Sequence, residues 1–185
     1  MKEIITLIFL SLSIFCNGQN ASIEKTVFGI QTGFLGIWVH NESRLSNTIA
    51  LRSEFGLDAG ILFTDFEGNS GFLLAPVLTL EPRFYYNLNK RNSKLKDISN
   101  NSGTFISLKT SYHPDWFVIS DITDHITSDI SFIPTLGIRR NIGTHFNYEA
   151  GFGFGYRYIF AKAAGYYSND SEAIGNLHLR IGYIF

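Results

Sequence analysis

This sequence has almost no cysteine, and its positive and negative charges nearly cancel. Cys16 is the single cysteine among 185 residues. The chain after residue 19 therefore has no thiol, which excludes a disulfide, a thiolate metal site and a cysteine nucleophile there. Lys and Arg number 15 against 16 Asp and Glu, which gives a net charge of -1. This balance offers no electrostatic reason to expect binding to nucleic acid or another polyanion.

Long hydrophobic runs are scarce as well. After residue 19 the chain lacks a run of the roughly 18 apolar residues that a transmembrane helix needs, so only strands in a closed barrel could cross a membrane. The run from Ile4 to Phe15 is too short to span a bilayer, and it lies between a positive residue and small ones. This pattern predicts a secretory signal peptide over residues 1–18, whose removal leaves residues 19–185 as one exported domain.

What the sequence does contain is strict alternation of apolar and polar residues. Between Thr144 and Ala161 the even positions are aromatic or apolar, whereas the odd positions carry glycines and polar residues such as Glu149 and Arg157. A period of two predicts a β-strand with one apolar and one polar face. A soluble core would not select a face of glycines and charges. We interpret the segment as a strand whose apolar face contacts lipid and whose polar face lines a barrel interior.

The same alternation recurs in weaker form along the chain. The predicted strands cover residues 27–39, 48–61, 72–88, 104–112, 116–122, 130–139, 144–161 and 176–185. An open sheet edge is not tolerated in lipid, and bacterial barrels have even strand numbers. The predicted fold class is therefore all-β, an eight-stranded antiparallel up-and-down transmembrane β-barrel.

The links between these strands differ in length, and this predicts the topology. Short links become periplasmic turns, and the longer links face outward. The predicted periplasmic turns are residues 65–71, 113–115 and 142–143. Pro76 and Pro82 each remove a backbone donor, which predicts bulges in the third strand. Trp38 is expected at a membrane interface, where amphipathic rings gather.

The final residues, L-H-L-R-I-G-Y-I-F at 177–185, alternate apolar side chains up to a terminal aromatic. With the signal segment, they make the chain resemble small Gram-negative outer-membrane β-barrel proteins of the OmpA/OmpX transmembrane type, a porin-like group of the cell envelope. The resemblance implies an outer-membrane location, with lipid and lipopolysaccharide as partners. It also implies that the barrel assembly machinery recognises Leu179, Ile181, Tyr183 and Phe185.

The predicted inward faces are rich in ionisable side chains. They are Arg52, Glu54, Asp58, Glu81, Arg83, Lys109, Arg139, Glu149, Arg157, His178 and Arg180. The interior of an eight-stranded barrel is just wide enough to be filled by side chains, so a solute pore is not expected. We predict that these groups pair as a charge network that plugs the lumen, because a lone buried charge is costly. Gly151, Gly153 and Gly155 are expected to leave room for the arginines, and a narrow ion-conducting path is the alternative.

Catalytic spacing is not evident. His145, Asn147 and Glu149 share one strand face, and His125 lies near Ser128, but neither set gives a nucleophile with an oriented base. We therefore predict that the chain is not an enzyme and needs no cofactor or metal. An outer-membrane enzyme that modifies lipid A is the alternative.

Two further possibilities concern binding. The basic residues Lys90, Arg91, Lys94 and Lys96 form a possible phosphate-binding loop for lipopolysaccharide, although a solvated loop is the simpler interpretation. A soluble lipocalin-like binding barrel also has eight alternating strands, but it turns its apolar face inward. The predicted function is a structural or surface-interaction protein of the outer membrane, with no nucleic-acid partner and an extracellular ligand that the sequence does not identify.

Overall fold

The computed structural model describes residues 21–63, 70–121 and 123–185, and this part of the chain is mostly β, with 64% of residues in strands. The predicted signal peptide at 1–18 and most of the predicted turn at 65–71 lie outside the described residues. No helix in the described ranges is long and apolar enough to cross a membrane.

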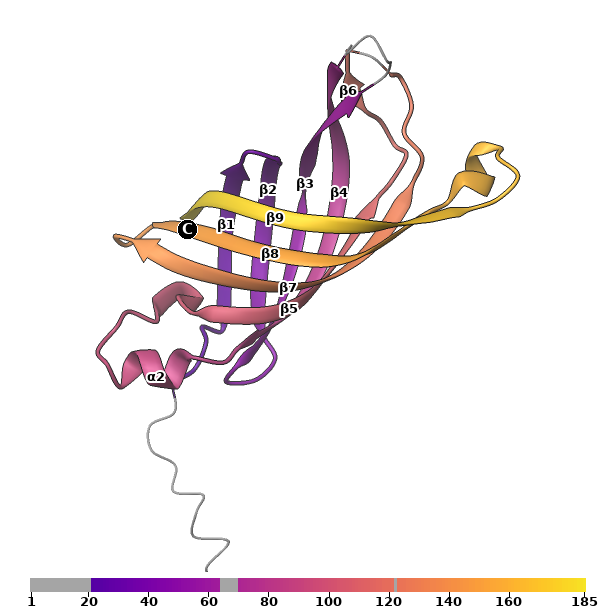
Figure 1. Cartoon of the computed structure of the whole chain (residues 1–185). Helices are drawn as coiled ribbons and strands as arrows, with labels where there is room; N and C mark the ends of the chain where they lie inside the picture. The colour runs from indigo at the N-terminus through magenta and orange to yellow at the C-terminus, as the bar shows by residue number, and fades with distance from the viewer. Residues whose placement is uncertain (1–20, 64–69, 122) are drawn as a thin grey trace, which may run out of the picture.

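Eight antiparallel strands form a closed ring in the order β1-β2-β3-β4-β5-β7-β8-β9, which closes where β9 pairs with β1 (Figure 1). The ring strands are β1 (Thr26–Gly33), β2 (Gly36–Arg44), β3 (Ile49–Phe63), β4 (Ser70–Tyr85), β5 (Thr104–His113), β7 (Asp129–Ile142), β8 (Phe146–Ile159) and β9 (Asp170–Ile184). The short strand β6 (Ile119–Ser120) pairs with β4 beside the ring. The links carry α2 (Leu88–Asn92), η1 (Ser99–Asn101) and η2 (Ala161–Ala164).

The first predicted strand, 27–39, is wrong, because the structure folds it into a hairpin. Gly33 pairs with Gly36, and Phe34 and Leu35 form the turn between β1 and β2. Gly36 has a φ of 141°, a backbone conformation that residues with a Cβ rarely adopt. The predicted strand at 116–122 is also wrong, since the described residues 116–121 form only the two-residue strand β6. The ring therefore contains eight strands, but the extra one comes from residues 27–39.

Because of this hairpin, several links lie at the end of the ring opposite to the predicted one. We name the end of the ring where β1 begins and β9 ends the terminal end, and the opposite end the far end. The links at the terminal end are 45–48, 86–103 and 143–145. The β1–β2, β5–β7 and β8–β9 links lie at the far end, as do the last residues of β3 and the first of β4. Of the predicted periplasmic turns, only 142–143 lies at the terminal end; 113–115 lies at the far end, and the basic loop at 90–96 lies with the termini.

The prolines of β4 cause no bulge. Pro76 pairs with Leu57 and Pro82 with Leu51 in one unbroken register that joins Ile49 of β3 to Phe84 of β4. The predicted bulges are therefore absent from this pairing. A proline lacks the N–H that donates to a ladder, but losing one donor does not require an inserted residue.

The two faces of the strands point as the alternation predicts. On β8, Phe152 and Phe154 expose 64% and 69% of their surface outside the ring, whereas Glu149 on the opposite face of the strand exposes 1%. A lipocalin-like barrel would have the opposite arrangement, with apolar side chains inside. The ring thus encloses polar side chains and displays apolar ones.

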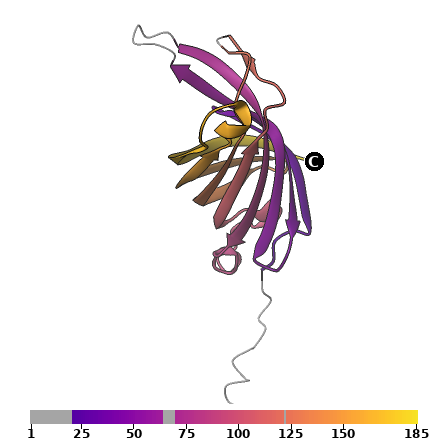
Figure 2. The same ribbon diagram turned by 90° about the vertical axis from the view of Figure 1, so that its right-hand side faces the viewer.

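An apolar cluster closes the terminal end. Ala21 and Ile23, ahead of β1, pack with Tyr85, Leu88 and Phe105, and all five are buried. Asn89 Oδ1 accepts a hydrogen bond of 2.8 Å from the Ala21 backbone, which ties the segment ahead of β1 to α2. At the far end, by contrast, β3 and β4 extend well past the β1–β2 hairpin (Figure 1, Figure 2).

Candidate functional site

The centre of the ring holds two glutamates among three arginines. Glu42 of β2 and Glu149 of β8 both contact Arg52, Arg83 and Arg139, which come from β3, β4 and β7. The Arg139 Nη2 lies 2.9 Å from Glu42 Oε2, and Arg83 Nη1 lies 3.1 Å from Glu149 Oε1. Each of these five side chains is at most 1% exposed. We name this group the central charge cluster.

Two more carboxylates extend the central charge cluster along the lumen. Glu54 accepts hydrogen bonds from Arg52 and, at 2.8 Å, from Arg180 of β9. Glu81 contacts Arg83 at 2.7 Å and accepts a hydrogen bond of 2.5 Å from the Ser107 hydroxyl. Four glutamates therefore face four arginines, so the charges within this network balance.

Neutral groups also form hydrogen bonds with the central charge cluster. The Tyr85 hydroxyl and the Asn101 amide each donate to Glu42 Oε1 at 2.7 Å. Gln31 accepts a hydrogen bond of 2.6 Å from Arg52 and donates to Asn147 at 3.0 Å. These bonds join β1, β2, β3, β4 and β8 across the lumen, so the network fixes the ring from inside.

Two arginines also lie over aromatic rings. The Arg180 guanidinium carbon is 3.8 Å from the centre of the Trp38 ring, and the Arg83 carbon is 4.1 Å from the Phe105 centre. Such cation–π contacts strengthen when they are removed from water.

The expected position of Trp38 at a membrane interface is wrong. Its indole is buried inside the ring and donates to Asp58 Oδ1 at 2.6 Å. Gly56 makes room for it, because a Cβ there would lie 2.7 Å from the indole.

The structure brings most of the predicted lumen residues together. Those that are buried in the lumen are Arg52, Glu54, Glu81, Arg83, Lys109, Arg139, Glu149, His178 and Arg180. Asp58 and Arg157 are only partly buried and lie towards the far end, where His113 bridges Asp58 at 3.2 Å and Asp129 at 3.0 Å. Arg157 pairs with Glu172 on the neighbouring strand.

The row of glycines on β8 has a different role from the predicted one. A Cβ on Gly151 would lie 2.6 Å from the His178 ring, and one on Gly153 would lie 2.5 Å from the Thr135 hydroxyl. A Cβ on Gly155 would meet the backbone of Phe132 at 2.0 Å. The glycines therefore accommodate a histidine, a threonine and a neighbouring strand rather than arginines.

Glu42 is the main residue that sequence reasoning missed. Residues 40–46 read as a polar link, but β2 continues through them to Arg44. The signal was present, because Trp38, His40 and Glu42 continue one inward face with a period of two. His40, also missed, is buried at 1% exposure beside Gly29.

The other predicted sites do not assemble into a catalytic arrangement. His145 stacks on Tyr183 at 5.3 Å at the terminal end, whereas Asn147 and Glu149 point into the lumen. His125 lies in the 114–128 link, where its backbone N–H contacts the Thr123 hydroxyl at 3.3 Å. Among the described residues, no group of three or more His, Cys, Asp or Glu side chains could hold a metal ion.

The basic loop is partly organised by its own contacts. Arg91 donates to the Asp97 carbonyl at 2.6 Å, while Lys90, Lys94 and Lys96 are exposed. Asp97 accepts hydrogen bonds from Ser99 and from Asn141 of β7. Partial burial acts to raise the pKa of Asp97, but these hydrogen bonds outweigh it and hold the pKa below its ordinary value.

The predicted assembly signal forms the last part of β9. Tyr183 and Phe185 are 5.3 Å apart between ring centres, and Phe185 also lies 5.5 Å from Phe28 of β1. Leu179 and Ile181 are exposed outside the ring. Ile181 and Tyr183 therefore lie in the seam where β9 pairs with β1, with Leu179 just before it and Phe185 just after it.

No protein-family model, curated protein or solved structure matches this chain. The class that the fold defines is an all-β antiparallel sheet with a closed ring of eight strands.

Proposed function

We propose that this ring is an up-and-down β-barrel that spans a Gram-negative outer membrane. In this proposal it acts as a structural or surface-interaction protein with a polar, plugged lumen, and it reaches the membrane by export and by the assembly machinery that recognises Leu179 to Phe185. The observation that carries the proposal is the sidedness of the ring: charges are buried inside, and large apolar side chains are exposed outside.

The outer surface supports the membrane location. Exposed large apolar side chains occur on all eight ring strands, and those of the C-terminal half include Ile106, Leu108, Phe132, Leu136, Phe146, Tyr148, Phe152, Phe154, Tyr156, Leu177, Leu179 and Ile181. Soluble monomers rarely expose a contiguous apolar patch beyond a few hundred Å². A belt of this kind around a closed ring is typical of a barrel in lipid, where every backbone group must find its partner in a neighbouring strand.

The interior supports a structural role over a solute channel. The central charge cluster fills the middle of the ring, and the apolar cluster of Ala21, Ile23 and Leu88 covers its terminal end. Buried arginines held by two or three carboxylates are not free to line a water path. The β3–β4 and β8–β9 hairpins then reach outward at the far end, where they are the natural surface for an extracellular partner.

The topology predicts which links a reagent outside the cell can reach. In intact cells, Tyr167→Cys in the far-end link should react with a membrane-impermeant maleimide, whereas Ser93→Cys at the terminal end should react only after the outer membrane is permeabilised. The parent chain, with Cys16 alone, is the control for background. Labelling of both positions in intact cells, with the folded protein in the membrane fraction, would contradict the proposed orientation.

The plugged lumen predicts the electrical behaviour of the purified protein. Reconstituted into a planar bilayer, the protein should give no stable open level of solute-sized conductance. Samples should first be checked for the heat-dependent gel shift of a closed barrel, so that an absence of conductance cannot be attributed to unfolded protein. A stable conductance that disappears when the protein is heated would favour the ion-conducting alternative.

A further inference from the structure

The ring wall is incomplete near the far end. β9 pairs with β1 only from Arg180 to Ile184, and its residues 170–179 pair with β8 alone in the described structure. On the other side, β3 pairs with β2 up to Asp58, Ala59 donates to the Leu35 carbonyl, and residues 60–63 pair with β4 alone in the described structure. The short β1–β2 hairpin thus leaves a notch between β9 and β3, with Phe34 and Leu35 at its base.

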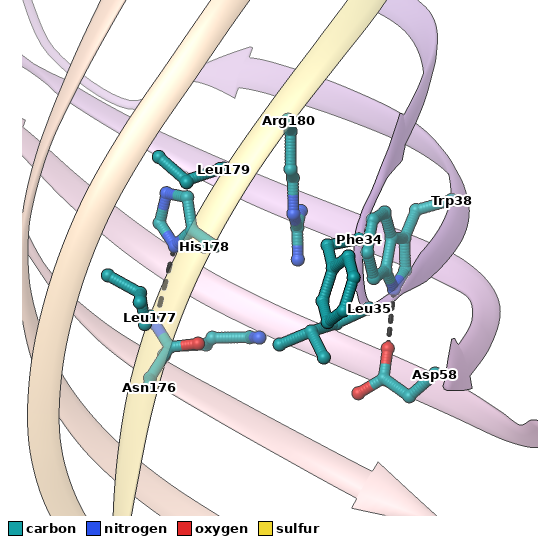
Figure 3. A pocket seen from close by; sticks show the side chains of 10 residues that line it. Phe34, Leu35, Trp38, Asp58, Asn176, Leu177, His178, Leu179 and Arg180 are labelled. Carbon is teal, nitrogen blue, oxygen red and sulfur yellow. Dashed lines mark hydrogen bonds between the residues drawn. The ribbon is translucent and has the colours of Figure 1, made fainter. Parts of the chain in front are cut away.

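A cavity of about 350 Å³ opens at this notch. Figure 3 shows Leu177 and Leu179 of β9 on one side of the cavity and Phe34 and Leu35 on the other, with Trp38 and Asp58 beside Phe34 and Leu35. The volume falls in the usual range for small-molecule sites, roughly 300–1,000 Å³. A second cavity of about 650 Å³ shares Leu35, Asp58, Lys109, Asn176 and Leu177 with it and continues towards the far end.

The inner wall of the cavity carries an unpaired cation. Lys109 is 8% exposed and lines both cavities. Among the described residues it has neither an ion pair within 4.0 Å nor a hydrogen bond from its ammonium. The nearby carboxylates are already engaged, since Asp58 binds Trp38 and His113, and Glu54 binds Arg52 and Arg180. The Lys109 ammonium therefore meets the cavity without a carboxylate of its own, so the cavity favours an anion.

We infer that the notch binds a single-chain amphiphile with one anionic head group, the chemistry of a fatty acid. The acyl chain lies between Leu177, Leu179 and Phe34, and the head group meets the Lys109 ammonium. A charge-assisted hydrogen bond there supplies the oxygen that the protein does not provide. The inference rests on the proposed function, because the ligand enters sideways from the lipid.

The strand edges of β9 and β3 that border the notch are also consistent with a ligand there. Backbone groups without partners are tolerated at membrane depth only where they line a cavity or contact protein. The outer face of β8 stays apolar as far as Tyr158, which pairs with Ser171 of β9, so the free edge of β9 lies beside the apolar belt. The notch is therefore reachable from lipid, while the two hairpins beside it reach beyond the ring.

Trp38 provides a direct probe of the notch, because it is buried and lines the cavity. The chain has two tryptophans, so Trp116→Phe leaves Trp38 as the single one. In phosphatidylcholine vesicles, 12-bromododecanoate should quench the Trp38 fluorescence saturably, because bromine quenches only at short range. The neutral 12-bromododecan-1-ol should quench it far less at the same concentration in the membrane.

Lys109→Met should weaken the apparent affinity for 12-bromododecanoate about tenfold, as expected when a hydrogen bond to a charged group is lost. Lys162→Met, which removes an exposed lysine from η2, is the matched control and should bind as the parent does. Phe34→Asp at the exposed rim is a second variant that should also weaken binding, because it places a charge where the acyl chain enters.

Each sample should float with the vesicles and show the heat-dependent gel shift. If samples that pass both checks show no saturable quenching, or equal affinity in Lys109→Met and the parent, the ligand site is overturned while the membrane barrel stands. Failure of the parent to float would instead overturn the proposed function.

Discussion

Replacing Glu149 by Gln should destabilise the protein by about 3–5 kcal/mol, the usual cost of removing one partner of a buried ion pair. Glu149 contacts Arg52, Arg83 and Arg139, and all four side chains are buried. Glutamine keeps the shape but removes the charge, so the arginines exceed the remaining carboxylates among buried side chains. Urea unfolding of the vesicle-bound protein, followed by tryptophan fluorescence, measures the loss.

Two further variants separate charge balance from local damage. Glu172→Gln removes a carboxylate from a half-exposed pair with Arg157, and it should change the stability by no more than about 1 kcal/mol. Arg139→Gln in the Glu149→Gln background removes the excess positive charge and should recover part of the lost stability, a non-additive result. A Glu149→Gln protein as stable as Glu172→Gln would mean that the central charge cluster does not hold the ring together.

The alternation of apolar and polar residues was enough to predict the long strands and their two faces. β8 follows it without interruption, so its extent and the outward direction of Phe152 and Phe154 could be read from the sequence. The β1–β2 hairpin could not be predicted in the same way, because its turn carries Phe34 and Leu35 in place of the polar residues that usually mark turns. That missed turn also misplaced the predicted turn at 113–115 and the basic loop at 90–96.

The members of the charge network were easier to predict than their pairing. Alternation identified Glu149, Arg139 and Arg180 as inward-facing, but their contacts depend on register. Glu149 lies directly opposite Arg139 on β7 and Arg180 on β9, yet Arg180 pairs with Glu54 across the lumen. Such contacts depend on closure of the ring, which local pattern does not encode. The notch likewise results from unequal strand lengths in different parts of the chain.

Replacing Phe152 by Arg tests where the outer face lies, and the expected result is a loss of about 2–4 kcal/mol in vesicles, the cost of an arginine on a barrel at the middle of a bilayer. Phe152 lies midway along the exposed apolar row of β8, between Phe146 and Tyr158. The new guanidinium would meet acyl chains there, and no neighbouring carboxylate faces outward on β8 to accept it. Urea unfolding in vesicles gives the change in stability, and flotation gives the fraction inserted.

The matched control is Tyr167→Arg, which adds the same charge to a fully exposed position in the β8–β9 link, outside the strands. It should leave stability within about 0.5 kcal/mol of the parent, as surface substitutions usually do. If the outer face were instead covered by water, Phe152→Arg would behave like this control and would make the protein more soluble without detergent. Equal stability of the two variants, together with recovery in the aqueous fraction, would therefore exclude the membrane location. An arginine at residue 152 is costly in lipid, whereas in water it should cost no more than one at residue 167.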